Sequence, residues 1–329
     1  MPTSQNLSTL RATAADLPHN SAANAEAIRA ELEAGLLATP ATTSPKYLYN
    51  ALGSRLFEAI CLLPEYYPTR TEAAIFDANL TQIAQAVGLG VTLIDLGAGN
   101  CAKAVSLFPA LQPRQYVPID ISAAFLAQAL TLIRPRFPAI EMTGIGLDFS
   151  SSLDLPATVR HESRLFFYPG SSIGNFAPEQ AVDFLRRIRT ACGAGGALLI
   201  GVDLIKDHAV LDAAYDDALG VTAAFNLNLL HHLNDTLGTD FVVGDWLHRA
   251  FYNPHQSRIE MHLEARRPLT VHWTGGQRHF AEGERIHTEN SYKYTVQSFS
   301  ALLGAAGFGA IRSWTDERDW FAVMHAQAV

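Results

Sequence analysis

The chain has 329 residues, 48% of them hydrophobic, and a formal net charge of −8 at pH 7. A chain of this length and hydrophobic content can bury one large core or two ordinary ones. Because a nucleic-acid partner needs a basic patch, which this acidic chain lacks, we expect a small-molecule partner and no nucleic acid.

Cysteine usage and hydropathy exclude further classes of protein. Cys61, Cys101 and Cys192 are widely spaced and form no CxxC pair, so we expect no disulfide framework and no metal site. The N-terminal region lacks the continuous apolar segment of a signal peptide, and no apolar run is long enough to cross a membrane. We therefore expect a cytoplasmic monomer without a membrane partner.

The first part of the chain is expected to be mainly helical. Residues 1–20 are polar and are expected to be poorly ordered. Apolar residues then recur at helical spacing over 22–37, and a second amphipathic stretch lies within 47–67, where prolines stop it. A further helix is predicted over 71–87.

A regular alternation of strands and helices begins at residue 91. Short apolar runs predict strands, and the amphipathic segments between them predict helices. This alternation predicts an α/β fold with a parallel, doubly wound sheet of the Rossmann type, which binds ligands at the carboxyl ends of its strands. The predicted strands are 91–95, 115–119, 142–147, 163–168 and 197–203, and the predicted helices are 101–108, 122–134 and 178–192.

After Lys206 the pattern changes. Residues 208–238 have a helical pattern, and residues 246–290 alternate as antiparallel strands with frequent Pro and Gly. A helix ending at Gly307 and a final strand would then complete the first sheet. We therefore predict a Rossmann-like core with an inserted α+β domain that binds the substrate: the core comprises 1–205 and 296–329, and the insert comprises 206–295.

A glycine-containing motif follows the first predicted strand. The run LIDLGAGN ends its strand at Asp95 and then places Gly97 and Gly99 in a short turn. Glycines let a strand-to-helix turn bring its backbone close to a ligand. The next strand ends at Asp120, where a carboxylate can hydrogen-bond ribose hydroxyls. This pattern predicts a nucleoside-binding site.

The nucleoside is expected to lack a pyrophosphate. The helix after the turn has no third glycine, which dinucleotide enzymes use for close helix–strand packing. S-adenosylmethionine fits instead, with Gly97 and Gly99 against its methionine part and Asp120 on its ribose. Asp148, at the end of the third strand, would contact the adenine amine, with Phe149 against the ring. Alternatively, each of these acids is only a strand-end or turn residue.

Five runs are more specific than a general nucleoside site: YLYNALGSRLFEAICLLPEYYPTRTE, LIDLGAGN, FYPGSSIGNF, AYDDALGVTAAFNLNLLHHLNDTLGTDF and ENSYKY. Together they resemble the histidine Nα-methyltransferases of ergothioneine biosynthesis. That family uses S-adenosylmethionine to trimethylate the α-amino group of L-histidine, which gives hercynine. The resemblance covers the chain from about residue 45 to its end, and it implies this activity here.

The resemblance also implies roles for individual residues. Tyr66 in PEYYPTR lies close to the substrate amine, and Asn175 in GSSIGNF binds the amino-acid head group; these two are the expected catalytic residues. Tyr215 in AYDD gives its hydroxyl to the substrate carboxylate. Glu289 and Ser291 hold the imidazole ring, and because they are two residues apart on a strand they point to the same face.

Two further motifs complete the implied site. Met261 lines the substrate pocket, and the YxxxGSxLF stretch covers the cofactor through Tyr49, Gly53 and Phe57. These residue types also have purely structural interpretations. Tyrosines beside prolines pack against turns, an asparagine in a Gly-Ser loop forms a turn, and a glutamate is usually solvated.

Two other functions remain open on the residues alone. An enzyme with another acceptor would keep the fold and the cofactor but methylate a different amino acid; the pair of Glu289 and Ser291 argues against it. A non-catalytic sensor would bind the cofactor and a small ligand without turnover. Cofactor binding without any methylated product would identify the sensor.

Overall fold

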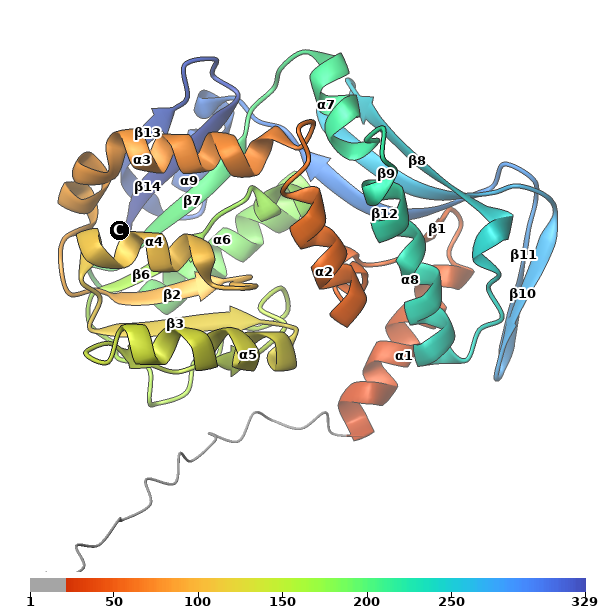
Figure 1. Ribbon diagram of the computed structural model, residues 1–329, viewed down its shortest axis with the longest axis horizontal. Coiled ribbons are helices and arrows are strands. Elements are labelled where there is room, and N and C mark those ends of the chain that lie inside the picture. Colours follow the sequence, from red (N-terminus) through yellow and green to blue (C-terminus); the bar gives the residue numbers. More distant parts are fainter. Residues whose placement is uncertain (1–21) are drawn as a thin grey trace, which may run out of the picture.

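The computed structural model describes residues 22–329, so the expectation for residues 1–20 lies outside the described residues. The described chain forms two halves that lie side by side, a larger α/β half and a smaller half built on its own sheet (Figure 1). Among residues 22–329, no helix is both long enough and apolar enough to span a membrane.

The larger half contains an eight-stranded sheet. Its order is β13 (Phe308–Thr315), β14 (Phe321–Ala328), β7 (Ala197–Asp203), β6 (Arg164–Tyr168), β2 (Thr92–Leu96), β3 (Gln115–Asp120) and β4 (Glu141–Met142), with β5 (Ile145–Gly146) also paired to β3. The pairings among β2 to β7 are parallel, whereas β14 is antiparallel to both of its neighbours. The predicted Rossmann-like α/β fold is confirmed.

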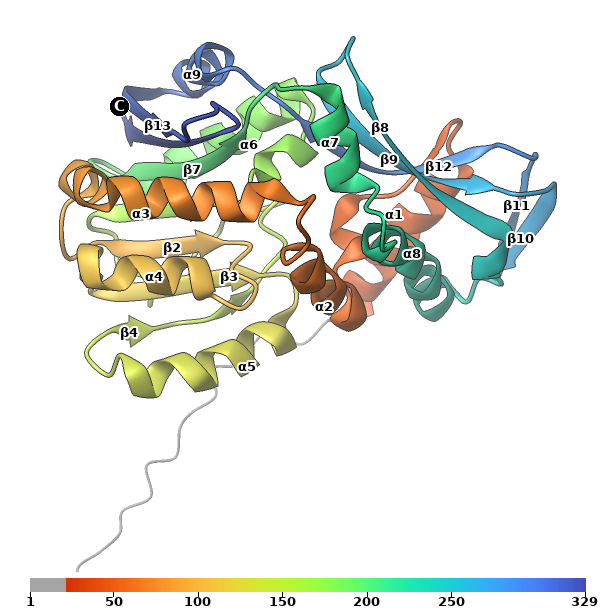
Figure 2. The same cartoon turned by 45° about the horizontal axis from the view of Figure 1, so that its top comes forward.

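Helices cover both faces of this sheet because its strands are apolar on both sides. Along β6, Leu165 and Phe167 face one helical layer, and Phe166 and Tyr168 face the other. Side chains alternate in direction along a strand, so a continuous apolar run indicates burial on both faces. One layer contains α3 (Tyr67–Val87), α4 (Ala102–Leu111) and α5 (Ala123–Ile133), and the other contains α6 (Pro178–Cys192) and α9 (Val296–Ala305) (Figure 2).

The strand order reverses at β2. From β2 the chain passes to β3 on one side, and it later returns to β6 on the other side of β2. Where connections diverge in this way, a crevice opens outside the carboxyl ends of the strands, and open α/β sheets bind their ligands there. The loops that follow β2 and β6 lie on either side of this crevice.

The smaller half contains a four-stranded sheet and a separate hairpin. The sheet order is β1 (Ala41–Thr42), β12 (Arg285–Tyr292), β9 (Arg258–Ala265) and β8 (Trp246–Asn253), and the hairpin is β10 (Leu269–Trp273) with β11 (Gly276–Phe280). Helices α7 (His208–Tyr215) and α8 (Val221–Leu237) share a buried cluster with this sheet. The helices and antiparallel strands expected here are present.

The N-terminal segment, which the predicted division assigned to the core, packs with the smaller half. Helices α1 (Ala22–Leu37) and α2 (Ala51–Ile60) and the 3-10 helix η1 (Pro45–Leu48) contact α8, and β1 pairs with β12. An amphipathic pattern predicts a helix but does not identify the surface against which it packs. We therefore propose two units, the first formed by 67–205 and 296–329 and the second by 22–66 and 206–295.

Two shorter segments also differ from the predictions. The strand expected over 142–147 is divided into β4 and β5, and the C-terminal segment adds two strands rather than one. At the break between β4 and β5, a Cβ on Gly144 would lie 2.6 Å from the side chain of Leu130 in α5. The close packing of α5 therefore leaves no room for a side chain at this break.

The ends of β7 and β12 join the two halves. Leu204 and Tyr294 form an isolated parallel bridge, and the Tyr294 N–H donates to the carbonyl of Asp203 at 3.0 Å. Nearby, a Cβ on Gly174 would lie 2.8 Å from the carbonyl oxygen of Tyr292, so this approach requires glycine. Strand β12 thus reaches from the smaller sheet to the carboxyl edge of the larger one.

A substitution at Gly53 tests whether the close packing of α2 on its neighbours stabilises the protein. In Gly53→Ala, the new Cβ would lie 1.8 Å from the carbonyl oxygen of Leu48, so the helix must move. We expect the free energy of unfolding, measured by urea denaturation, to fall by about 1–3 kcal/mol. The matched control is Gly304→Ala, in α9, where the new Cβ meets no atom within 4 Å. This control should be neutral or stabilising by up to about 1 kcal/mol, and equal losses in both variants would contradict the packing role.

Candidate active site

Two cavities meet over the carboxyl ends of the parallel strands. The larger has a volume of about 1230 Å³, above the roughly 300–1,000 Å³ usual for small-molecule sites. It therefore has room for a ligand of nucleoside size. Residues from both halves form the wall that the two cavities share: Tyr49, Phe57, Tyr66, Gly170, Ser172 and Asn175.

The glycine turn after β2 lines the larger cavity. Gly97 and Gly99 have φ angles of 71° and 52°, a region that favours glycine. The Gly97 N–H donates to the carbonyl of Ile119, and the Gly99 N–H donates to the carboxylate of Asp120, both at 2.9 Å. A Cβ on Gly97 would point at the Phe149 ring, 3.8 Å away. The turn is thus held against β3 while its backbone faces the cavity.

Asp120 lines the same cavity and hydrogen-bonds the backbone of two turns, the glycine turn after β2 and the turn after β3. Its carboxylate accepts from the N–H of Gly99 and from that of Ser122 at 2.8 Å. Burial raises the pKa of Asp120, against the opposing effect of these backbone donors. Asp95 is engaged instead by the Tyr116 hydroxyl at 2.7 Å, and burial raises its pKa to about 7. Asp95 is buried whereas Asp120 is half-buried, so Asp120 is the more accessible of the two carboxylates to a ligand in the cavity.

Asp148 and Phe149 also line the larger cavity. Asp148 pairs with Lys46 of η1 at 3.0 Å and accepts a hydrogen bond from Ser150. Burial acts to raise the pKa of Asp148, but the donors Ser150 and Lys46 outweigh it and hold the pKa below its ordinary value. The sequence analysis missed Lys46, because this contact joins residues 102 positions apart and no local pattern reveals it.

The wall shared by the cavities is aromatic and uncharged. Tyr49 packs edge-on against Phe57 and Phe225, with ring centroids 5.5 and 5.4 Å away. Tyr66 packs between Phe57 and Tyr215, at 6.1 and 6.2 Å. Burial raises the pKa of Tyr49 and of Tyr66 well above the ordinary value, so both hydroxyls stay neutral.

The loop after β6 brings Asn175 to this wall. Asn175 ends the short 3-10 helix η3 (Ser172–Asn175) and lines both cavities. The start of the loop is held by Glu72 of α3, which accepts from the Gly170 N–H at 2.8 Å and pairs with Lys103 at 2.6 Å. Sequence reasoning missed Glu72 and Lys103, since their contacts also join distant parts of the chain.

The smaller cavity holds the predicted substrate residues. Among residues 22–329, no side chain hydrogen-bonds the carboxylate of Glu289, which faces this cavity. Burial raises the pKa of Glu289 to about 7, while the charge of Lys293 acts to lower it. A buried carboxylate without a donor is costly, so this group is suited to a donor on a ligand. The predicted residues that line the cavity are Tyr66, Asn175, Tyr215, Met261, Glu289 and Ser291.

Lys293 is a site residue that the sequence analysis missed. Its buried ammonium donates to the hydroxyls of Tyr215 and Ser291 at 3.1 and 2.7 Å, and it pairs with Asp203 at 2.7 Å. Lys293 follows Ser291 by two residues, as Ser291 follows Glu289. The period of two along a strand was therefore a signal that could have found it.

Gly53, which the resemblance placed against the cofactor, is not among the residues that line either cavity. Its N–H donates to the Asn50 side chain that caps α2, at 2.8 Å. A Cβ on Gly53 would also lie 3.3 Å from the amide of Asn228 in α8. Glycine is needed here because α2 approaches η1 and α8 closely. The glycine in the motif therefore serves helix packing.

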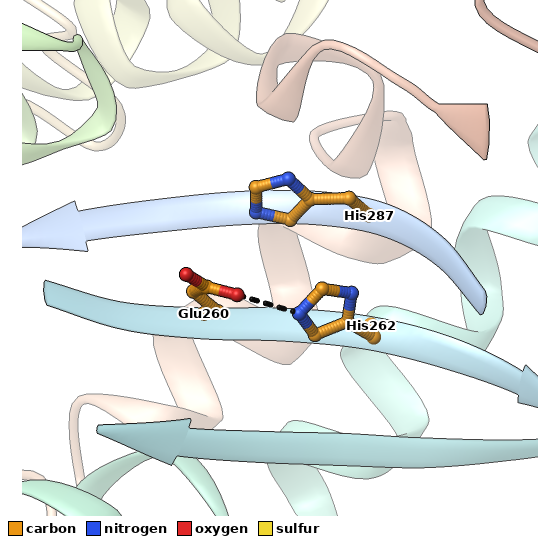
Figure 3. Close-up of side chains that lie close together, drawn as sticks. All are labelled: Glu260, His262 and His287. Atoms are coloured by element: carbon orange, nitrogen blue, oxygen red, sulfur yellow. Dashed lines mark hydrogen bonds and ion pairs between the residues drawn. The ribbon is translucent and has the colours of Figure 1, made fainter. Parts of the chain in front are cut away.

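One group of His and Glu side chains among residues 22–329 lies close enough to hold a cation. The ligand atoms of Glu260, His262 and His287 lie within 4.8 Å of one another (Figure 3). Arg258 already pairs with Glu260 at 2.7 Å. The two imidazoles stack, with centroids 4.7 Å apart and planes 23° apart, so their in-plane lone pairs do not converge. This is the geometry of an ion pair beside stacked rings, and we propose no metal there.

The arrangement suits group transfer between two bound ligands. The larger cavity offers a glycine turn without side chains and a carboxylate to a nucleoside, and the smaller offers the Glu289 carboxylate and several hydroxyls, among them those of Tyr215 and Ser291, to a polar ligand. At the shared wall, Tyr49, Tyr66 and Asn175 can hydrogen-bond a reacting group without carrying charge. Such a site acts by holding two reactants in contact rather than by supplying a nucleophile.

Comparisons with known proteins agree with this chemistry. The chain matches the model of the family described as histidine-specific, SAM-dependent methyltransferases over residues 28–328. It is 40% identical over 309 residues to the histidine N-alpha-methyltransferase of Mycolicibacterium smegmatis, covering 92% of this chain and 95% of that protein.

Two fungal proteins are also similar. Ergothioneine biosynthesis protein 1 of Neurospora crassa is 30% identical over 289 residues, which cover 82% of this chain and 31% of that protein. The N-methyltransferase imqF of Aspergillus flavus is 31% identical over 303 residues, which cover 87% of this chain and 81% of that protein.

Cys101, beside the glycine turn, should be chemically inert. It precedes α4, where a helix N-terminus can lower a thiol pKa, but burial raises the pKa of Cys101 to about 12. We expect iodoacetamide at pH 8 to leave Cys101 unmodified in the native protein and to modify it after denaturation, as read by peptide mass spectrometry. Rapid modification of the native protein would contradict this burial.

Proposed function

The chain belongs to the family of histidine-specific, S-adenosylmethionine-dependent methyltransferases, and we propose that it trimethylates the α-amino group of L-histidine to hercynine. The observation that carries this acceptor is the Glu289 carboxylate, which is buried in the smaller cavity two residues before Ser291. The name of the Neurospora crassa relative supports a place for this reaction in ergothioneine biosynthesis.

The larger cavity fits S-adenosylmethionine. When bound, this cofactor supplies an electrophilic methyl group on a sulfonium. Gly97 and Gly99 present open backbone to its methionine part, and Asp120 is the carboxylate that would accept from the ribose hydroxyls. Phe149 would lie against the adenine, with Asp148 accepting from its amine while it keeps its pairing with Lys46.

The side chains that line the smaller cavity, which has a volume of about 40 Å³, match the polar groups of histidine in one orientation. Glu289 would accept from an imidazole N–H, and the Ser291 hydroxyl would meet the other ring nitrogen. Tyr215 and Asn175 would bind the amino-acid head group, with Met261 packing beside it. The α-amine then lies at the wall shared with the larger cavity, close to Tyr66, where it can meet the methyl group.

The uncharged wall suits repeated transfer to one amine. Only a neutral amine has a lone pair to attack with, so a proton must leave before each transfer, and water can carry it away. Tyr66 and Asn175 can hold the amine without repelling a cationic methyl donor. Holding two reactants in a near-attack geometry is worth roughly 7–11 kcal/mol. As methyl groups replace N–H donors, neutral neighbours lose less than a fixed ion pair would.

The main alternative is that the methyl group is transferred to an acceptor other than histidine. The Aspergillus flavus relative is named only as an N-methyltransferase, so relatives of this chain need not all take histidine. The unpaired Glu289 carboxylate favours an acceptor with an N–H at this point, as imidazole has. A site with buried polar groups rejects an analogue that leaves them unpaired, by as much as ~10⁴-fold. We further propose that the enzyme is a cytoplasmic monomer.

A mass-spectrometric assay tests the proposed function. Purified protein is incubated with S-adenosylmethionine and each common amino acid in turn. We expect histidine alone to gain three methyl groups, in sequence. Methylation of a different amino acid would overturn the acceptor but keep the cofactor. Cofactor binding without any product would show a sensor rather than an enzyme.

Glu289 gives the reaction a predictable dependence on pH. Because burial raises the pKa of Glu289 to about 7, its carboxyl becomes protonated as the pH falls through that value and stops accepting from imidazole. We expect kcat/KM for histidine, which reports the free enzyme, to fall between pH 8 and pH 6. In Glu289→Gln, kcat/KM should be at least about ten-fold lower at pH 8, and its fall toward pH 6 should be smaller because only the titration of free histidine remains.

Two controls separate this role from a general loss of structure. The dissociation constant of the cofactor should change less than about two-fold in Glu289→Gln. Glu264→Gln, in the neighbouring strand β9 but lining neither cavity, should leave kcat/KM within about two-fold. Equal losses of histidine and cofactor affinity in Glu289→Gln would contradict the proposed role of Glu289 in binding imidazole.

Asp120 gives the corresponding prediction for the cofactor. Asp120→Ala removes the carboxylate that faces the larger cavity and holds the Gly99 N–H. We expect the dissociation constant of S-adenosylhomocysteine, measured by calorimetry, to rise at least about ten-fold, because hydrogen bonds to a charged group are lost. An unchanged value would show that the ribose site lies elsewhere.

A further inference from the structure

Lys293 lies behind the substrate cavity and contacts two of its hydroxyls. The side chain has no exposed surface, and its ammonium lies 3.1 Å from the Tyr215 oxygen and 2.7 Å from the Ser291 oxygen. The third contact is the Asp203 carboxylate, at 2.7 Å. An ammonium has three N–H donors and no acceptor, so these three oxygens use all of its donors.

These contacts determine what the two hydroxyls can offer a ligand. Tyr215 and Ser291 also lie 2.7 Å from each other, so one hydroxyl donates to the other. Because Lys293 donates to both oxygens, each oxygen keeps one accepted hydrogen bond whatever the other hydroxyl does. The hydrogen bond between the hydroxyls can therefore break without leaving either oxygen unsatisfied, and both hydrogens are then free to point into the cavity.

We infer that Lys293 is a positioning residue that makes Tyr215 and Ser291 hydrogen-bond donors to the substrate. Together with the Glu289 carboxylate, which accepts, these two hydroxyls then form a set of two donors and one acceptor on the cavity wall. That set selects a ligand with a carboxylate at Tyr215, a ring nitrogen lone pair at Ser291 and an N–H at Glu289. Neutral imidazole has both of the ring groups. The inference rests on the proposed function. It adds that Lys293 determines which groups of the site donate hydrogen bonds and which accept them.

Asp203 keeps this ammonium charged in a buried place. The carboxylate also pairs with Lys206 at 2.6 Å and accepts from the Tyr67 hydroxyl at 2.7 Å. One carboxylate thus faces two ammonium groups. Removing either lysine leaves a balanced pair, so single variants of Lys293 or Lys206 should fold. Lys206 contacts neither Tyr215 nor Ser291, and it therefore provides a matched control.

The experiment compares Lys293→Met with Lys206→Met in steady-state kinetics. Lys293→Met keeps a long side chain but loses the three donors. We expect KM for histidine to rise at least about ten-fold, with kcat and the dissociation constant of S-adenosylhomocysteine within about three-fold of wild type. Lys206→Met should leave KM within about three-fold. If Lys293→Met fails to bind S-adenosylhomocysteine, Lys293→Gln, which keeps two neutral N–H donors, is measured in its place.

A second readout separates positioning from a structural role. Histidine amide lacks the carboxylate that Tyr215 would bind, so the wild type should prefer histidine to its amide in kcat/KM. In Lys293→Met this preference should shrink about ten-fold, because Tyr215 is no longer directed to donate. An unchanged preference would overturn the inference, as would equal rises of KM in the two lysine variants.

The outcomes also separate this inference from the proposed function. A wild-type protein that methylates no histidine would overturn both. A wild-type protein that does so, together with a Lys293→Met variant of unchanged KM, would overturn only the inference.

Discussion

A buried ion pair and a backbone bridge together join the two sheets of this protein. Asp203 ends β7 of the larger sheet, and Lys293 directly follows β12 of the smaller one. Burying two charges is costly unless further hydrogen bonds satisfy them. Here the charges are satisfied by contacts with four further side chains, those of Tyr67, Lys206, Tyr215 and Ser291. The pair therefore makes it unfavourable for β12 to leave the edge of the larger sheet.

The position of β12 explains why the two cavities share a wall. The reversal of strand order at β2 places a nucleoside-sized cavity at the carboxyl edge of the larger sheet. Strand β12 brings Glu289 and Ser291 to the same edge, and the N-terminal segment contributes Tyr49 and Tyr66. Each cavity is thus completed by the other half of the molecule. In this way the sheet topology acquires a second cavity, which is lined by side chains of both halves.

The elements that could be predicted from sequence are those with local signals. Strand and helix alternation predicted the larger sheet, and acids at strand ends marked the larger cavity, where Asp120 and Asp148 lie. Packing partners could not be predicted. The helical pattern of 22–37 does not show that α1 lies on α8, and the motif around Gly53 does not show that its glycine serves helix packing. Lys293 could have been predicted from the sequence, because Glu289, Ser291 and Lys293 alternate with a period of two. This alternation points to a shared site only once β12 is known to be buried.

In the proposed complex, one histidine molecule binds with its ring at Glu289 and Ser291 and its amine at the shared wall. A crystal structure with S-adenosylhomocysteine and L-histidine tests it most directly. The account predicts an imidazole between Glu289 and Ser291, a carboxylate on Tyr215 and an α-nitrogen beside Tyr66, facing the sulfur. A histidine bound in the opposite direction, or one bound in the larger cavity, would contradict it.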